Sequence, residues 1–245
     1  MAAGLGTRLR PITNDRPKAL VEVAGRTMLE LTLMRLRDFG IDEVIINTHH
    51  FAGLVADYLR AYKNFGMQIE ISHEEILLDT GGGIKRAAHF FLQSDEPFLV
   101  HNVDVLSNID FGQMLQFHQE HNALGTLAVQ DRPTSRYLLF DENGDLCGRR
   151  AGVTGESELV RPVEEENALA FSGIHILSPR IFPLLNEDGI FSIIPAYLRL
   201  AAQREHLCAF RADRYYWRDL GRPDHIVEAA RDLTSGRYEG RFPTT

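Results

Sequence analysis

The sequence predicts an α/β fold in which helices flank a mostly parallel mixed sheet. Three observations carry this prediction. Helical and strand patterns alternate through the first half of the chain, the links between them are short, and glycines follow two of the expected helices. Repeated strand–helix units with short links favour parallel strands with helices on both faces of the sheet. The expected arrangement is Rossmann-like.

The first half supplies these elements in order. Residues 26–40 carry apolar side chains at mostly helical spacing and end on Gly40, a common helix stop. The stretch FAGLVADYLRAYKNFG (51–66) indicates a second helix, closed by Gly66. Further helices are expected to begin at a glycine turn over 81–93 and at 111–121. The expected strands are 43–48, 67–72, 97–106 and 124–130.

The regular alternation of strand and helix patterns ends at about residue 130. The stretch RYLLFDENGDLCGRR (136–150) indicates a hairpin that turns at Glu142-Asn143-Gly144. Strands are expected at 168–177, 206–212 and 215–220, and helices at 191–205 and 223–233. The sequence has no internal repeat, low-complexity block or linker, so a single domain over 1–245 is expected.

Composition excludes several classes of protein. The formal net charge is -8, which disfavours nucleic-acid binding because that function needs a basic face. The two cysteines, Cys147 and Cys208, form no disulfide framework. The sequence shows no signal-peptide pattern and no apolar run long enough to span a bilayer. A cytoplasmic location without nucleic-acid or membrane partners is therefore expected.

The opening stretch, MAAGLGTRLRPITNDRPKAL, concentrates positive charge in an acidic chain. Four cations surround one anion: Arg8, Arg10, Arg16 and Lys18 against Asp15. A glycine turn beside cations lets backbone N–H groups approach phosphate oxygens. A dinucleotide fingerprint fails because its third glycine position holds Leu9, and no P-loop is present. A tight turn with solvated arginines is the alternative.

The motif AAGLGTRLRP…RPKAL resembles the signature of the sugar-1-phosphate nucleotidylyltransferases, and the resemblance covers essentially the whole chain. It implies a nucleotide-diphospho-sugar transferase fold with a nucleotide-binding part over about 1–130 and a sugar-binding part over about 131–245. It also implies transfer of a nucleoside monophosphate from an NTP to a sugar 1-phosphate, with release of pyrophosphate. By this resemblance, Arg8 holds the leaving phosphates and Lys18 contacts phosphate at the reacting centre. The glycine loop wraps the nucleotide through Ala3, Gly4, Gly6 and Thr7.

The stretch EEILLDTGGGIKRA contains three consecutive glycines, Gly81–Gly83, which predict a special turn. A helix N-terminus without a ligand is the alternative. The resemblance implies that the backbone near Thr80 and Gly81, with Glu74 upstream, reads the base. The form LDTGGGI is similar to the N-acetylmuramic-acid-1-phosphate uridylyltransferases of cell-wall recycling, which favours UMP transfer. Guanylyl relatives carry similar loops, so guanylyl or thymidylyl transfer to a mannose-, heptose- or glucose-type phosphate stays open.

Two aspartates, Asp104 and Asp219, each follow an apolar strand, where open α/β sheets place their ligands. A carboxylate pair can hold Mg²⁺, which also bridges to substrate phosphates. Two unrelated strand-end aspartates are the alternative. The resemblance implies that both residues hold this metal, although the family's usual Gly-Asp is Val103-Asp104 here.

The sugar side carries the weakest signal. The stretch FSGIHI resembles the family strand whose glycine, here Gly173, lets backbone N–H groups reach the sugar. The usual Glu-Lys-Pro is missing, so Glu166 in RPVEEEN is the predicted hydroxyl contact, with a solvated acidic loop as the alternative. Histidines 49, 50, 118 and 121 are expected to be structural or exposed, because neither an H-E-x-x-H motif nor a Cys/His cluster is present.

The family's glycine loop usually follows a central strand, whereas Met1 already stands at the loop. We therefore expect the natural chain to begin upstream. A minimal enzyme, monomer or dimer, is expected, since no helical oligomerisation domain follows. A non-catalytic regulatory protein that binds nucleotide sugars remains the alternative from another functional class.

Overall fold

The computed structural model describes residues 1–238. The chain divides into two compact units. The first contains Met1–Asp79, Asn102–Ile109 and the segment from Tyr215 onward, and the second contains Thr80–His101 and Asp110–Arg214. The expected boundary near residue 130 does not coincide with these units. The expected boundary separates a nucleotide-binding part from a sugar-binding part. The compact units do not test ligand binding, so this division stays a prediction.

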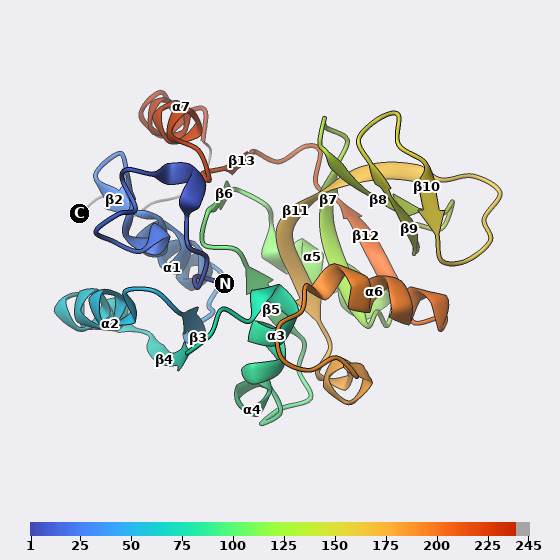
Figure 1. Ribbon diagram of the computed structural model, residues 1–245, viewed down its shortest axis with the longest axis horizontal. Coiled ribbons are helices and arrows are strands. Elements are labelled where there is room, and N and C mark those ends of the chain that lie inside the picture. Colours follow the sequence, from blue (N-terminus) through green and yellow to red (C-terminus); the bar gives the residue numbers. More distant parts are fainter. Residues whose placement is uncertain (239–245) are drawn as a thin grey trace. The chain divides into compact units, whose positions relative to one another are not determined.

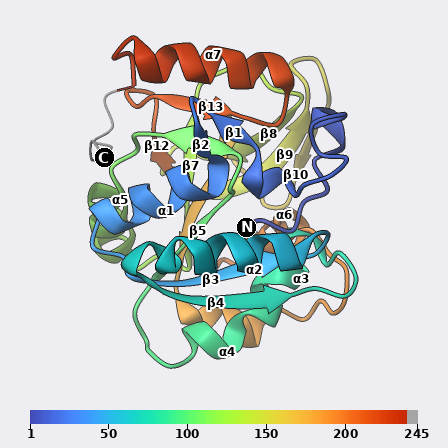
Figure 2. The same cartoon turned by 90° about the vertical axis from the view of Figure 1, so that its left-hand side faces the viewer.

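The first unit is built on three strand pairs. Strands β3 (Glu43–Thr48) and β4 (Gln68–His73) pair in parallel (Figure 2). Strands β6 (Val105–Ser107) and β13 (Trp217–Asp219) pair antiparallel, and β1 (Glu22–Val23) forms a hairpin with β2 (Arg26–Thr27). The unit's helices are α1 (Met28–Asp38), α2 (Ala52–Ala61) and α7 (Pro223–Thr234), and its 3₁₀ turns are Thr7–Leu9, Lys18–Leu20 and Lys63–Gly66.

The second unit contains the larger sheet, in the order β10-β9-β8-β11-β7-β12, with β5 paired to another part of β11 (Figure 1). Its strands are β5 (Phe98–His101), β7 (Gly125–Gln130), β8 (Arg136–Phe140), β9 (Leu146–Ala151), β10 (Ser157–Leu159), β11 (Asn167–Leu177) and β12 (Leu207–Arg211). Every residue of β7 is buried, so this strand forms part of the core. The helices are α3 (Asp79–Arg86), α4 (Ala88–Phe91), α5 (Phe111–Glu120) and α6 (Ile193–Ala202), with a 3₁₀ segment at Pro179–Leu184.

The predicted α/β class, a mixed sheet flanked by helices, is confirmed, but the expectation that most strands pair in parallel is wrong. Among the described strands, β3–β4 and β7–β12 pair in parallel, and the remaining ladders are antiparallel. The predicted hairpin after residue 136 is present as β8 and β9. Across residues 1–238, no helix combines the length and the apolar character that crossing a bilayer requires.

Helix ends follow local chemistry. Helix α1 begins after Thr27, whose hydroxyl accepts a hydrogen bond from the Glu30 N–H at 3.0 Å. It ends as predicted before Gly40, which adopts a left-handed φ of 75°. The prediction that Gly66 closes the next helix is wrong. Helix α2 ends at Ala61, and a left-handed 3₁₀ segment over Lys63–Gly66 follows it.

Two further predictions need correction. The apolar run 97–106 is not one strand, because it breaks at Asn102–Asp104 into β5 and β6. Gly81–Gly83 do not form a turn, because they lie buried within α3. A Cβ atom on Gly81 would stand 2.3 Å from the Phe191 ring, so a side chain there would collide with its neighbour. Close packing, rather than an unusual backbone conformation, accounts for glycine at this position.

Candidate active site

The glycine loop is held by hydrogen bonds to one backbone carbonyl. The Gly6 carbonyl accepts from the Leu9 N–H and from the Thr13 hydroxyl, both at 2.9 Å. Gly6 has a φ of 62°, and a Cβ there would lie 3.1 Å from the Lys18 Cβ. Glycine is therefore required both for the backbone conformation and for the close approach of the Lys18 stem. Of the predicted loop contacts, Gly4 and Thr7 are exposed, whereas Ala3 is buried.

Lys18 and Asp104 form the tighter of the two ion pairs among the predicted site residues. The Lys18 ammonium donates to Asp104 Oδ2, and the two side chains are 13% and 16% exposed. Lys18 begins a 3₁₀ turn directly after Pro17, and Asp104 occupies the break that precedes β6. Ion pairs removed from bulk water are screened less than surface pairs. The pair therefore fixes a cation and an anion in a defined geometry.

Arg8 and Asp219 form the looser pair. Arg8 Nη2 lies 3.8 Å from Asp219 Oδ2, and the side chains are 55% and 32% exposed. The Gly221 N–H donates to Asp219 Oδ1 at 2.6 Å, which orients the carboxylate. A Cβ on Gly221 would stand 2.5 Å from Arg8 Nη2, so glycine leaves room for the guanidinium. The exposed arginine head remains accessible to an anionic ligand.

Backbone pairing joins the segments that carry the two carboxylates. Asp219 lies opposite Val105 in the β6–β13 ladder, and the Leu220 N–H donates to the Asp104 carbonyl at 2.7 Å. Asp219 ends β13 and Asp104 directly precedes β6, so the two carboxylates lie at the same end of this strand pair, although 115 positions separate them in the sequence. The fold brings the four predicted charged residues together as two ion pairs on these segments and the glycine loop.

Asn47 is a site residue that sequence reasoning missed. Its Oδ1 accepts from the Ala2 N–H at 2.6 Å, and its Nδ2 donates to Glu74 Oε1 at 2.8 Å. Glu74 is 1% exposed, and its Oε2 accepts from the Leu78 N–H at 3.0 Å. The predicted base-reading carboxylate is thus held within an internal network that ties the glycine loop to the end of β4. The run 43–48 marked Asn47 as a strand position, but nothing in the sequence indicated its link to Ala2 and Glu74.

The other predicted base contacts lie in the second unit. The Thr80 hydroxyl accepts from the Ile193 N–H at 3.0 Å, and the Gly81 N–H donates to the Phe191 carbonyl at 2.9 Å. The Gly81 N–H is therefore already donated in this conformation. Base recognition by Glu74, Thr80 and Gly81 stays a prediction.

The predicted sugar contacts also lie in the second unit. Gly173 is buried with a φ of 73°, at the point where the register between β11 and β7 shifts. Such a bulge takes backbone groups out of the ladder, which is compatible with a ligand contact. Glu166 accepts from the Ser157 hydroxyl at 2.5 Å and lies 3.6 Å from Arg150 Nη1. Its carboxylate is part of the β9–β10 region, and a sugar contact there stays a prediction.

The histidines behave mostly as predicted. His118 is buried between the hydroxyls of Thr126 and Ser178, at 2.9 and 3.0 Å, which is a structural role. Burial lowers the pKa of its imidazole to about 4.

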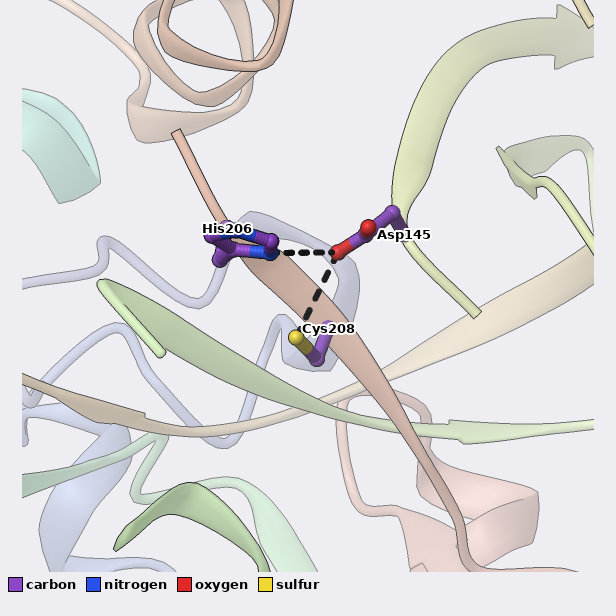
Figure 3. A group of neighbouring side chains, drawn as sticks. All are labelled: Asp145, His206 and Cys208. Carbon is purple, nitrogen blue, oxygen red and sulfur yellow. Dashed lines mark hydrogen bonds and ion pairs between the residues drawn. The ribbon is translucent and has the colours of Figure 1, made fainter. Parts of the chain in front are cut away.

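The expectation that no Cys/His cluster exists needs correction, because the fold brings Asp145, His206 and Cys208 together (Figure 3). Both cysteines are free thiols, as the absence of a disulfide framework predicted.

The comparisons with known proteins agree with this geometry. The family model described as nucleotidyl transferase matches residues 1–236. The chain is similar to N-acetylmuramate alpha-1-phosphate uridylyltransferase from Caulobacter vibrioides, with 35% identity over 94% of this chain and 93% of the relative. It is also similar to the catalytic subunit beta of mannose-1-phosphate guanylyltransferase from Dictyostelium discoideum, with 29% identity over 93% of this chain but only 61% of that protein. The crystal structure of HddC from Yersinia pseudotuberculosis has the same fold, with a TM-score of 0.76 and 23% identity. The match covers 95% of this chain and 96% of that chain.

The ion pairs beside a glycine loop, the fold and the full-length matches together define the class: the chain belongs to the nucleotidyl transferase family. Within that family it groups with the sugar-1-phosphate nucleotidyltransferases, as the glycine-loop motif predicted.

Proposed function

We propose that the protein is a Mg²⁺-dependent enzyme that transfers UMP from UTP to N-acetylmuramic acid 1-phosphate. A phosphate oxygen of the sugar phosphate attacks the α-phosphorus of UTP, the bond from that phosphorus to the bridging oxygen breaks, and pyrophosphate leaves. The observation that carries the proposal is the Lys18–Asp104 pair, with Arg8 and Asp219 on adjoining segments. In-line phosphoryl chemistry depends mainly on positioning and charge stabilisation, which these groups supply.

The two cations have different parts in this reaction. Lys18 is half-buried and held in place by Asp104, so its ammonium stabilises negative charge that develops at the α-phosphate. Arg8 is more exposed and loosely paired, so its planar guanidinium can bind oxygens of the leaving pyrophosphate. Asn47 positions the glycine loop by accepting a hydrogen bond from the Ala2 N–H. The backbone of this loop would contact the nucleotide.

The donor set fits Mg²⁺. Asp104 and Asp219 offer only carboxylate oxygens, on strands joined by the Leu220 N–H to Asp104 carbonyl bond, and Mg²⁺ prefers oxygen ligands. When bound, Mg²⁺ would neutralise charge on the substrate phosphates. Lys18 and Arg8 would bind phosphate oxygens beside it.

The choice of base and sugar rests on the LDTGGGI motif and on the full-length similarity to an N-acetylmuramate alpha-1-phosphate uridylyltransferase. Guanylyl transfer to a mannose-type phosphate is the second candidate, favoured by the similarity to mannose-1-phosphate guanylyltransferases, of which the chain spans about three fifths. Thymidylyl transfer and heptose- or glucose-type acceptors complete the family alternatives.

The test is a pyrophosphate-release assay with Mg²⁺. UTP, GTP, dTTP, CTP and ATP are each paired with N-acetylmuramic acid, mannose, glucose and heptose 1-phosphates. We expect the highest kcat/KM with UTP and N-acetylmuramic acid 1-phosphate. A higher value with another pair would keep the chemistry and overturn the substrate assignment. A folded protein that binds nucleotide sugars but releases no pyrophosphate with any pair would be the regulatory protein instead.

A further inference from the structure

Three potential metal ligands meet in the second unit, on elements that the proposed reaction does not use. Asp145 Oδ1 lies 3.5 Å from His206 Nδ1 and 3.5 Å from Cys208 Sγ (Figure 3). One ligand atom from each residue lies within 4.8 Å of the other two. Within the described part of the chain, this is the one such group of three.

Strand geometry explains the assembly. His206 and Cys208 flank Leu207 at the start of β12, and residues two apart on a strand project to the same face. Asp145 pairs directly with Cys208 through an isolated antiparallel bridge, and the Ala209 N–H donates to the Gly144 carbonyl at 2.8 Å. The turn between β8 and β9 is thereby fixed against the start of β12, with all three side chains on one side.

We propose that Asp145, His206 and Cys208 bind a divalent transition metal of the Zn²⁺ type, with water as the fourth ligand. Thiolate, imidazole and carboxylate are the ligands that Zn²⁺ accepts in tetrahedral sites. Zn²⁺ bond lengths of about 2.0–2.3 Å give ligand-to-ligand distances of roughly 3.3–3.6 Å, and two of the three separations already match. The exposed His206 ring, 63% accessible, can adjust to complete the third.

The surroundings orient the Asp145 carboxylate toward the other two residues. Arg161 Nη2 lies 3.7 Å from Asp145 Oδ2, the oxygen that faces away from the cluster, and 2.5 Å from Asp141 Oδ2. Asp141 Oδ1 also accepts the Asp145 N–H at 2.9 Å. These contacts hold the Asp145 carboxylate with Oδ1 toward His206 and Cys208, as outer partners orient metal ligands. A Cys208 thiolate and the Asp145 carboxylate would together neutralise a 2+ ion.

A metal here would join the β8–β9 turn to the edge strand β12. Its role would therefore be to stabilise the second unit, separately from the Mg²⁺ proposed at Asp104 and Asp219. The site at Asp145, His206 and Cys208 contains a thiol, whereas the proposed Mg²⁺ site contains only carboxylates. Co²⁺, a substitute for Zn²⁺, binds thiolate and Mg²⁺ does not, so Co²⁺ distinguishes the two sites.

The test is titration of the full chain with Co²⁺ in excess Mg²⁺. We expect a sulfur-to-cobalt charge-transfer absorption in the near ultraviolet that saturates at one equivalent, and a rise in Tm when Zn²⁺ is added. Cys208→Ser should abolish the absorption, and the matched control Cys147→Ser should keep it, because Cys147 is a buried thiol outside the cluster. His206→Ala changes an exposed side chain, so it should fold and weaken Zn²⁺ binding at least tenfold.

Two results would overturn the proposal. One is wild-type protein without the charge-transfer absorption, which would make these contacts an ordinary hydrogen bond and ion pair. The other is a Zn²⁺ affinity that His206→Ala leaves unchanged. Measurements of pyrophosphate release play no part in this test, so failure of the proposed function would not affect it.

Discussion

The four charged residues of the candidate active site, in the first unit, are partly exposed, whereas the second unit buries His118 and His175 in hydrogen-bonded groups that stay neutral. Lys18 pairs with Asp104 and Arg8 with Asp219, with side chains between 13% and 55% exposed. His175 is 4% exposed and lies 2.6 Å from the Tyr197 hydroxyl. Burial lowers the pKa of His175 to about 3 and raises that of Tyr197 well above its ordinary value. The phenol therefore keeps its proton, and the hydroxyl and His175 Nδ1 share one hydrogen bond.

The contrast teaches how to separate catalytic from structural polar groups in this fold. A buried polar group that stays neutral and fully hydrogen-bonded contributes to stability. In an ion pair that water can still reach, each charged residue can exchange its partner for a ligand. Variants of the first kind should change Tm and spare turnover, and variants of the second kind should do the reverse.

The largest effect is expected for Asp104→Asn, which keeps the shape of the side chain and removes its charge. Turnover should fall by about two orders of magnitude or more, the scale of lost electrostatic contacts at reacting phosphates. Steady-state pyrophosphate release measures this loss, and Asp57→Asn, an exposed aspartate of the same unit, is the matched control. An Asp104→Asn enzyme with wild-type turnover and Mg²⁺ dependence would remove this residue from the site.

A smaller effect is expected for Arg8→Ala. Arg8 is exposed and its ion pair spans 3.8 Å, so its loss should lower kcat/KM for UTP by about tenfold, the scale of one charge-assisted hydrogen bond. The Tm should not change. Arg60→Ala, which breaks an exposed pair with Asp57, is the control. Equal losses in both variants would mean that Arg8 acts only through the overall charge.

In the second unit, Tyr197→Phe should lower stability and leave turnover within twofold of wild type. The change leaves His175 Nδ1 buried without this hydrogen-bond partner, which costs about 1–3 kcal/mol. For a chain of this length that corresponds to a decrease in Tm of several degrees. Thermal unfolding measures it, with Tyr62→Phe on the surface as the control. A catalytic defect at unchanged Tm would reverse the assignment.

The pH dependence of stability should carry the signature of two of the buried histidines, His118 and His175. Their folded pKa values, about 4 for His118 and about 3 for His175, lie below the ordinary value of 6.5. The unfolded chain therefore binds protons first as pH falls below 6.5, and stability is lost from there toward the folded pKa values. At pH 5 the loss should be about 2 kcal/mol for each histidine.

Urea unfolding at pH 7.5 and pH 5 tests this expectation. His118→Gln should lessen the difference between the two pH values, because it removes one of the two proton-binding groups. Equal stability of the wild type at both pH values would contradict the assignment of neutral buried imidazoles.

The sequence predicted the charged residues of the candidate active site better than it predicted their contacts with neighbouring residues. Lys18 and Asp104 could be found because they belong to short motifs, and Asp219 because it ends an apolar strand. Their pairing, and the tie of Asn47 to Ala2 and Glu74, depends on which strands lie side by side, which no local pattern contains.

The missed features share that cause. In the run 97–106, apolar residues stand on both sides of Asn102 and Asp104, so these two polar residues did not distinguish a break from a continuous strand. Gly81 lies in a helix against the Phe191 ring, a packing partner 110 positions away that the local sequence does not reveal. Asp145 and Cys208 meet through a single bridge between segments 63 residues apart. Patterns within the chain predict elements, whereas register and packing partners decide these contacts.

The central claim is that the Lys18–Asp104 pair is the catalytic centre. Lys18→Ala tests it most directly, with turnover and Tm measured on the same preparation and Lys63→Ala as the exposed-lysine control. We predict a turnover at least about a hundredfold lower, with a Tm within a few degrees of wild type. Wild-type turnover in Lys18→Ala, or a loss of activity that only follows unfolding, would contradict the claim.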